Sequence, residues 1–245
     1  TNEINLTASL RLAEVSKKYG VEKFINFSSC SVYGFNSQKE YLDEDDLKSP
    51  VSAYAKCKVK LEEKLADISN DKFIIINMRN STVFGCSDNL RLDLVANDFL
   101  FNAYFNKKIS ILSDGKPWRP MVHVKDIADL SDFFVENTRQ NTTVNIGSNE
   151  LNVQVRDIAE SISNKINSDL EIKNLNPSDK RSYKVSFDKL KNITNKNDYR
   201  DFDYFSDEFK EMIKEHKLTK ESFLEKDTIR LKKLSKYIVD GKIPY

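Results

Sequence analysis

The chain has 245 residues with 39 basic and 38 acidic side chains, which gives a formal net charge of +1. This balance argues against a nucleic-acid or membrane-surface role, because both roles require a surface of one sign. No apolar run reaches the ~20 residues that a membrane span needs, so we expect no membrane insertion. The length predicts one domain with an appendage, or two closely packed lobes.

The cysteines and histidines give no sign of a metal site. Cys30, Cys57 and Cys86 are odd in number and lack the spacing of metal ligands. They are interpreted as reduced thiols of a cytoplasmic protein. His123 and His216 are the only histidines, and they lie far apart in the sequence. We therefore predict no metal.

Helices and strands are predicted to alternate along most of the chain. The first helix spans residues 4–19 and is expected to end at Gly20. Its buried side is predicted to carry Ile4, Leu6, Leu10, Leu12, Ala13 and Val15. Further helices are predicted over residues 53–69, 91–106, 125–138, 153–166, 205–215 and 225–239. Strands are predicted over residues 23–28, 73–79, 108–112, 121–124, 143–147, 170–174 and 183–187. Residues 35–50 are polar and are predicted to form a loop.

Tyr54 and Lys58 lie four residues apart in a predicted helix, so their side chains share one face. A tyrosine ionises near pH ~10, and a neighbouring ammonium lowers this pKa by stabilising the phenolate. Such a phenol can act as an acid or a base near neutral pH. Ser29, at the end of the preceding strand, is placed to donate to the same substrate oxygen. The alternative is a solvated basic face, because this helix is rich in lysine.

Three later segments extend this pattern. Arg79–Gly85 follows an apolar strand, and Asp114–Ala128 and Val144–Ser148 come after it in that order. With the serine, tyrosine and lysine above, they make residues 1–190 resemble the extended short-chain dehydrogenase/reductases, in particular the nucleotide-sugar epimerases and dehydratases. The resemblance implies an α/β fold, with a Rossmann-like doubly wound parallel sheet that is partial in this chain. It also implies a smaller C-terminal α+β substrate lobe.

The resemblance assigns residues 1–88 and 120–150 to the cofactor-binding Rossmann domain, and 89–119 and 151–245 to the substrate lobe with its helical tail. The family's glycine-rich turn, which receives the dinucleotide pyrophosphate, has no counterpart in this sequence. Either two or three N-terminal βα units, roughly 60–90 residues, are absent from the chain as given, or the natural protein lacks them. We favour the first interpretation, because half a sheet would expose a hydrophobic edge.

The resemblance also implies the site residues. Tyr54 becomes the catalytic acid/base, Lys58 its electrostatic partner and Ser29 the third catalytic residue. Tyr54 and Lys58, with Asn80 and Ser81, are assigned to the cofactor NAD, with NADP as the alternative. The residues assigned to the nucleotide-sugar substrate are Ser29, Ser31, Thr82, Arg91, Arg119 and Arg181. Arginine suits phosphate because its planar fork meets two oxygens at once.

Asp126 and His123, at the start of the helix predicted over residues 125–138, are not assigned to catalysis. Asp126 is expected to cap the helix over residues 125–138. His123 is interpreted as a structural strand residue.

Cys30 and Ser31 occupy the positions where sugar 4,6-dehydratases of the family carry an acidic proton donor. Neither is a good proton donor at neutral pH, which points toward redox chemistry at a sugar carbon. The prediction is an NAD-dependent epimerase that oxidises a nucleotide-activated sugar transiently at C4, in surface polysaccharide or deoxysugar synthesis. The alternatives are a nucleotide-sugar 4-dehydrogenase or 4-ketoreductase, and a non-catalytic nucleotide-binding scaffold without the cofactor lobe. The resemblance also implies a homodimer formed through helices 4–19 and 53–69.

Overall fold

The structure is a computed structural model that describes residues 1–34, 39–175, 182–225 and 237–240. The chain divides into two compact units, each assembled from three stretches of sequence. Unit 1 comprises Thr1–Val83, Pro117–Val153 and Asp179–Tyr199, and unit 2 comprises Phe84–Lys116, Gln154–Ser178 and Arg200–Tyr245. The segment Asp179–Tyr199 thus clusters with unit 1, whereas the predicted substrate lobe included it. The assignment of cofactor and substrate to the two lobes stays a prediction.

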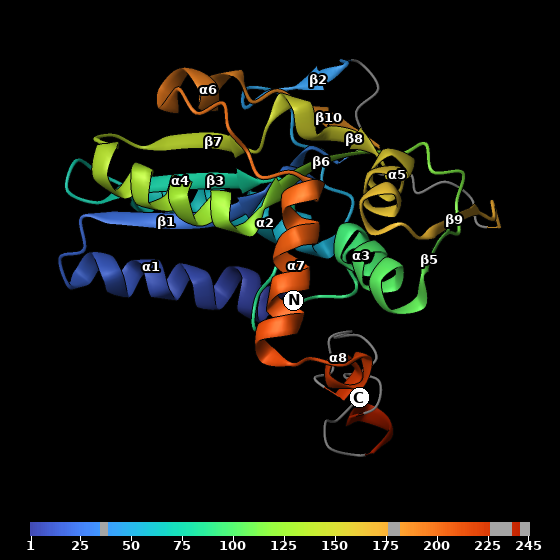
Figure 1. Cartoon of the computed structure of the whole chain (residues 1–245). Coiled ribbons are helices and arrows are strands. Elements are labelled where there is room, and N and C mark those ends of the chain that lie inside the picture. The colour runs from blue at the N-terminus through green and yellow to red at the C-terminus, as the bar shows by residue number, and fades with distance from the viewer. Residues whose placement is uncertain (35–38, 176–181, 226–236, 241–245) are drawn as a thin grey trace. The chain divides into compact units, whose positions relative to one another are not determined.

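Unit 1 is built around a parallel sheet with the strand order β1-β3-β7. Its strands are β1 (Lys23–Ser29), β3 (Ile74–Asn80) and β7 (Thr142–Ile146). Parallel sheets are buried on both faces, and helices cover both faces here (Figure 1). The helices α1 (Ser9–Lys18) and α2 (Ala53–Ile68) lie on one face, and α4 (Val124–Asn137) lies on the other. The predicted α/β fold with a parallel sheet is confirmed.

Each face of the sheet has its own apolar core. On the α1 and α2 side the buried side chains are Ala13, Leu61, Leu65, Phe73 and Ile75. On the α4 side they are Ile76, Met78, Val122, Ile127, Leu130, Phe134, Val144, Ile146 and Leu190. Burying one large aliphatic or aromatic side chain stabilises a fold by about 1.5–3 kcal/mol. The two cores therefore hold the strands and α2 at fixed positions.

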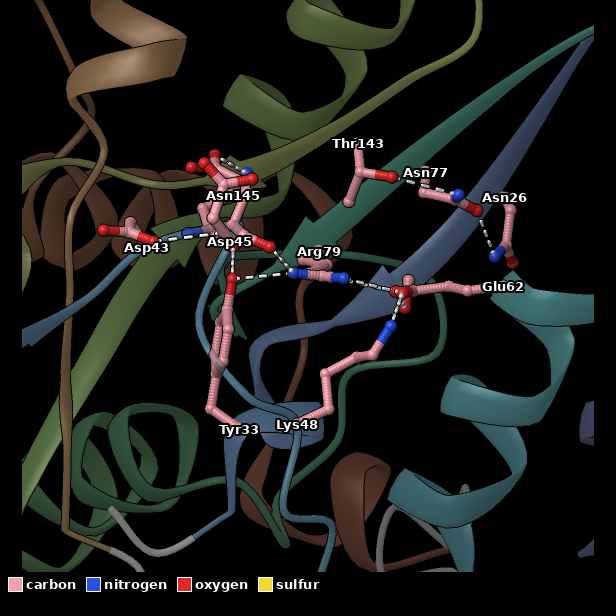
Figure 2. Close-up of polar contacts among 12 residues, drawn as sticks. Asn26, Tyr33, Asp43, Asp45, Lys48, Glu62, Asn77, Arg79, Thr143 and Asn145 are labelled. Atoms are coloured by element: carbon pink, nitrogen blue, oxygen red, sulfur yellow. Dashed lines mark hydrogen bonds and ion pairs between the residues drawn. The ribbon is translucent and has the colours of Figure 1, made fainter. Parts of the chain in front are cut away.

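The α2 face of the sheet changes from apolar to polar along the strands. Asn26 donates to the Asn77 carboxamide oxygen at 2.8 Å, and Asn77 donates to the Thr143 hydroxyl at 3.2 Å. These three residues are register partners, so their side chains form a polar row across all three strands (Figure 2). The next row toward the carboxyl ends of the strands consists of Ser28, Arg79 and Asn145.

Short elements lie mostly in unit 1, although the last residues of β4 and β8 belong to unit 2. The strand β2 (Tyr41–Leu42) pairs in parallel with β10 (Lys184–Val185), and the 3-10 turns are η2 (Cys30–Tyr33) and η3 (Asn149–Leu151). The strands β4 (Thr82–Phe84), β6 (Trp118–His123) and β8 (Asn152–Gln154) form a second sheet in the order β4-β6-β8. The short helix α6 (Asp188–Thr194) places Leu190 in the α4-side core, and the sequence did not predict it.

Unit 2 contains helices and one small sheet. Its helices are α3 (Val95–Asn106), α5 (Val155–Ile166), α7 (Phe202–His216) and α8 (Lys220–Glu225). The strand β5 (Lys108–Ile111) pairs in parallel with β9 (Asp169–Ile172). Aromatic rings fill the space between α3, α7 and α8, where Phe209 and Phe223 stack with ring centroids 5.7 Å apart. Across the described part of the chain, we find no helix with the length and apolarity that a membrane crossing requires.

The predicted buried side of the first helix is partly wrong. A π-helical segment, η1 (Glu3–Ala8), runs directly into α1, and Ala13 is the buried residue of α1. Ile4, Leu12 and Val15 are 74%, 60% and 51% exposed. An apolar stripe shows which face of a helix favours burial, but it carries no information on what covers that face.

The predicted cap of α4 is also corrected. His123, not Asp126, is the N-cap residue, and its Nδ1 accepts a hydrogen bond from the Lys125 backbone at 3.2 Å. Asp126 lies in the first turn, fully buried, and makes an ion pair with Lys196 at 3.4 Å. Of the predicted helix over residues 225–239, residues 226–236 lie outside the described part of the chain.

Candidate active site

The helix α2 presents three functional side chains on one stripe. Tyr54, Lys58 and Glu62 follow one another at four-residue spacing, so they lie one above the next on the helix surface. Ser52 caps the helix, because its hydroxyl accepts a hydrogen bond from the Ala55 backbone at 3.1 Å. Beside the C-terminal end of the stripe, Leu61 and Leu65 flank Glu62 and pack into the apolar core. The helix is thus fixed at its apolar end and carries Tyr54 at its first turn.

Lys58 connects this helix to the first strand. Its Nζ donates to the Phe27 carbonyl oxygen at 2.7 Å and lies 5.6 Å from the centroid of the Tyr54 ring. Burial lowers the pKa of Lys58, while the negative charge of Glu62 opposes that shift. The ammonium group and the phenol of Tyr54, which is 40% exposed, therefore occupy the same end of α2.

Ser29 ends β1 and begins η2. Its hydroxyl oxygen accepts a hydrogen bond from the Ser31 backbone at 3.2 Å, so the hydroxyl hydrogen can be donated to a ligand. Ser29 is the register partner of Asn80, the last residue of β3. The carboxamide oxygen of Asn80 is buried and has no hydrogen-bond partner among the described residues. Ligands of open α/β sheets bind at these carboxyl ends of the strands.

Cys30 and Ser31 come directly after Ser29, and neither can act as a general acid. The Cys30 thiol is buried and donates to the Arg79 carbonyl oxygen at 3.0 Å. Burial raises the pKa of this thiol to about 12, so it stays protonated and unreactive at neutral pH. The Ser31 hydroxyl is buried without a hydrogen-bond partner among the described residues. Cys30 is therefore a packing residue.

Arg79 is the centre of a buried polar network beneath the site (Figure 2). Its Nε and Nη2 donate to the two carboxylate oxygens of Glu62 at 3.1 and 2.8 Å. Its Nη1 donates to the Tyr33 hydroxyl at 2.9 Å and to the Glu44 carbonyl oxygen at 3.1 Å. Although burial opposes it, Glu62 holds the pKa of Arg79 above its ordinary value.

Tyr33 extends the network to β7. Its hydroxyl donates to the Asn145 carboxamide oxygen at 2.7 Å, and burial raises the pKa of this phenol. The Asn145 backbone in turn donates to the Glu44 carboxylate at 2.7 Å. The phenol of Tyr33 is thus neutral and structural, in contrast to the half-exposed phenol of Tyr54.

The remaining predicted site residues are distributed over both units. In unit 1, the Ser81 backbone donates to the Ile146 carbonyl oxygen at 3.0 Å, and Thr82 begins β4. Arg119 lies in β6, and its Nη1 donates to the Trp118 carbonyl oxygen at 2.8 Å. Arg91 belongs to unit 2 and pairs with Asp93 at 2.6 Å. Arg181 lies outside the described residues.

Sequence reasoning missed the part that Glu62 plays. Its position four residues after Lys58 would have placed it on the same stripe. It would also have suggested a partner from the neighbouring strand. The contact between Tyr33 and Asn145 could not be predicted from spacing, because the two residues are 112 positions apart in sequence.

Comparison with known proteins decides the family. A model described as "NAD dependent epimerase/dehydratase family" matches residues 1–147. The chain belongs to this family. The resemblance to the extended short-chain dehydrogenase/reductases is thereby confirmed.

The individual relatives cover the chain only in part. A UDP-glucuronate 4-epimerase of Thermodesulfobacterium geofontis is 33% identical over 128 residues, which are 51% of this chain and 38% of that protein. A dTDP-D-glucose 4,6-dehydratase of Homo sapiens is 26% identical over 147 residues, 60% of this chain and 41% of that protein. The chain therefore matches less than half the length of either curated relative.

Solved structures cover more of the fold. The structure of a UDP-N-acetylglucosamine 4-epimerase from Methanobrevibacter ruminantium M1, in complex with UDP-N-acetylmuramic acid, superposes with a TM-score of 0.75 at 24% identity. It covers 86% of this chain and 70% of that one. At this identity the likeness shows the fold alone.

Proposed function

We propose that the protein is an NAD-dependent epimerase that acts on a nucleotide-activated sugar by transient oxidation at C4. The arrangement of Lys58 carries the proposal. Its ammonium group is held at the end of β1 by the Phe27 carbonyl, on the same helix face as Tyr54. This arrangement supports a phenolate at Tyr54, with the Ser29 hydroxyl at the neighbouring strand end.

The proton chemistry follows from these three residues. Tyr54 takes the proton from the C4 hydroxyl of the sugar, and Lys58 stabilises the phenolate before the transfer. Ser29 donates a hydrogen bond to the same sugar oxygen and holds it in line with Tyr54. A bound nicotinamide would supply the hydride acceptor and donor for C4, and inversion requires the 4-keto sugar to rotate in the site before the hydride returns to its other face. Tyr54 then gives its proton back to the C4 oxygen.

The nicotinamide end of the cofactor fits the residues present. The buried carboxamide oxygen of Asn80 has no partner among the described residues and would accept a hydrogen bond from the cofactor. Lys58 uses one of its three N–H donors on Phe27, so others remain for a ribose hydroxyl. Ser81 is also assigned to the cofactor, together with Tyr54. NAD rather than NADP is part of the proposal.

Cys30 and Ser31 favour epimerisation over dehydration. Loss of water from the sugar requires a proton donor beside the leaving hydroxyl. The Cys30 thiol has a pKa of about 12 and donates to the Arg79 carbonyl, so it does not serve that role. Thr82, Ser31 and the arginines Arg91, Arg119 and Arg181 remain the proposed contacts to the nucleotide sugar. A one-way 4-dehydrogenase or 4-ketoreductase uses the same three catalytic residues and is the second candidate.

The decisive experiment uses the natural protein with UDP-glucuronate or UDP-N-acetylglucosamine and NAD, followed by NMR at C4. Inversion at C4 without net reduced cofactor supports the epimerase, and net NADH supports the dehydrogenase. A mass spectrum of the denatured protein is the companion measurement, because an epimerase that recycles its cofactor is expected to release NAD.

The variant Tyr54→Phe should lose at least about 100-fold in turnover and keep sugar-nucleotide binding. Undiminished turnover would refute the assignment.

The proposal extends to the setting of the protein. We propose a homodimer formed through α1 and α2, and a role in surface polysaccharide or deoxysugar synthesis in the cytoplasm. Light scattering of the natural protein tests the first part, with a monomer as the contradicting result.

A further inference from the structure

Glu62 is buried in the middle of the helix that carries Tyr54 and Lys58. Its side chain is 5% exposed and accepts three hydrogen bonds from the sheet. One comes from the Ser28 hydroxyl at 2.5 Å, and two come from Arg79 at 3.1 and 2.8 Å. Lys48 approaches the same carboxylate at 4.0 Å. Glu62 thus joins α2 to β1 and β3 at one point (Figure 2).

Arg79 holds the opposite side of this contact. Its guanidinium is 4% exposed and uses both of its arms, one on Glu62 and the other on Tyr33 and the Glu44 carbonyl. A two-pronged contact of this kind fixes direction as well as distance. These contacts therefore constrain both the distance and the direction of Glu62 relative to β3.

Stability alone does not account for such a pair. Removing two charges from water costs several kcal/mol per ion, and apolar residues of similar size often serve a fold as well or better. The apolar core contacts of α2 are already present on both sides of Glu62, at Leu61 and Leu65. The two-pronged ion pair beside this core adds a directional constraint to the position that apolar packing gives α2.

We propose that Glu62 and Arg79 are positioning residues, which lock the rotation and height of α2 so that Tyr54 and Lys58 meet the strand ends in register. This inference rests on the proposed function. Lys58 lies one turn from Glu62, and its ammonium reaches the Phe27 carbonyl only while α2 keeps this height. A displacement of about 1 Å at a catalytic group can cost 100-fold in rate.

The test replaces the pair with apolar residues of similar length, Glu62→Met together with Arg79→Met. This variant avoids the unpaired buried charge that either single change would leave. If the pair positions α2, kcat falls at least ten-fold while KM stays near the natural value and the variant still unfolds in one cooperative thermal transition. If a folded double variant keeps kcat within two-fold, the proposal is overturned.

A second variant decides the matter even if the double variant does not fold. Glu62→Asp keeps the charge opposite Arg79 but shortens the side chain by one methylene group. The carboxylate then reaches Arg79 only if α2 moves, and kcat should fall at least five-fold. An unchanged kcat in folded Glu62→Asp contradicts the proposal. Lys64→Gln is the matched control, because Lys64 lies on the exposed side of α2, and its kcat should not change.

A measurement without substrate separates this proposal from the proposed function. The rate of acetylation of Lys58 by acetic anhydride, read from its peptide by mass spectrometry, reports how firmly the Phe27 carbonyl holds the ammonium. It should rise at least three-fold in Glu62→Asp, while acetylation of Lys64 stays constant. A constant Lys58 rate overturns the positioning role, even if Tyr54→Phe shows the enzyme assignment to be right. If Tyr54→Phe keeps full turnover, the proposed function fails, and the acetylation rate still tests the positioning.

Discussion

Lys58 and Phe27 are joined by a 2.7 Å hydrogen bond from the ammonium group to the backbone carbonyl. The carbonyl belongs to β1, two residues before Ser29, so the catalytic helix and the catalytic strand share a direct contact. A backbone acceptor cannot be removed by substitution, which makes this contact independent of the side chain at position 27. Phe27 itself is half exposed.

The lowered pKa of Lys58 predicts a specific pH dependence of stability. Its folded-state pKa lies below the unfolded value of about 10.4, so between these two values the unfolded chain holds a proton that the folded chain has lost. The unfolded state binds more protons there, and the contribution of Lys58 to stability rises with pH through that window. Urea denaturation at several pH values should show the natural protein gaining stability relative to Lys58→Met on the alkaline side. Parallel curves would contradict the shift.

Gly34 is predicted to be irreplaceable, unlike Gly20. Both have positive φ, +63° and +79°, which strains any side chain. A Cβ at Gly34 would lie 1.7 Å from the Ser49 carbonyl oxygen, whereas one at Gly20 would meet nothing within 4 Å. Gly20→Ala should cost about 1 kcal/mol of unfolding free energy. Gly34→Ala should cost at least ~2 kcal/mol more, measured by chemical denaturation. Equal losses of unfolding free energy in the two variants would show that the Ser49 backbone moves away at little cost.

The hydroxyl of Tyr33 is predicted to contribute to stability. Tyr33→Phe removes the 2.7 Å bond to Asn145 and the acceptor for Arg79, and it leaves both groups buried without that partner. The expected loss is about 1–3 kcal/mol in unfolding free energy. Tyr19→Phe is the matched control, because Tyr19 is 79% exposed and should change stability by less than about 0.5 kcal/mol. A loss below 0.5 kcal/mol for Tyr33→Phe would mean that water replaces the hydroxyl.

The three cysteines are predicted to react in a fixed order. A thiolate is the reactive form, and Cys30 combines full burial with a pKa of about 12. Cys86 is partly exposed and should be alkylated first by iodoacetamide at pH 8. Cys30 should react only at the rate of unfolding, which peptide mass spectrometry can follow. Early labelling of Cys30 would contradict its role as a packing residue.

The sequence predicted the main strands of unit 1 well, and the clearest signal was the apolar run Phe73–Met78 that leads through β3. The predicted spans 73–79 and 143–147 became β3 (Ile74–Asn80) and β7 (Thr142–Ile146). The helix over 53–69 became α2 (Ala53–Ile68), whose start is fixed by the Ser52 cap. A two-residue strand such as β2 is too short to show the alternation of apolar and polar residues from which strands are predicted.

The candidate site was predictable only where it follows local spacing. Tyr54 and Lys58 are one helical turn apart, so the sequence itself placed them on one face. The network around Arg79 instead depends on tertiary contacts between segments far apart in sequence, such as the contact of Glu44 with Asn145. The helix cap shows a similar limit. An aspartate is the better cap by residue type, yet the helix begins three residues before the position that Asp126 would need, and His123 caps it.

The row of Asn26, Asn77 and Thr143 has a consequence for folding. A slip of two residues between β1 and β3 would keep every side chain on its own face, so the apolar pattern alone penalises it only weakly. A slip that places Asn77 opposite Phe24 would remove the hydrogen bond from Asn26 and leave the buried carboxamide oxygen of Asn77 unmatched. An unmatched buried amide costs about 1–3 kcal/mol. The row therefore selects one alignment of the strands as the chain collapses, and the positions of Ser29 and Asn80 at the sheet edge are set at that moment.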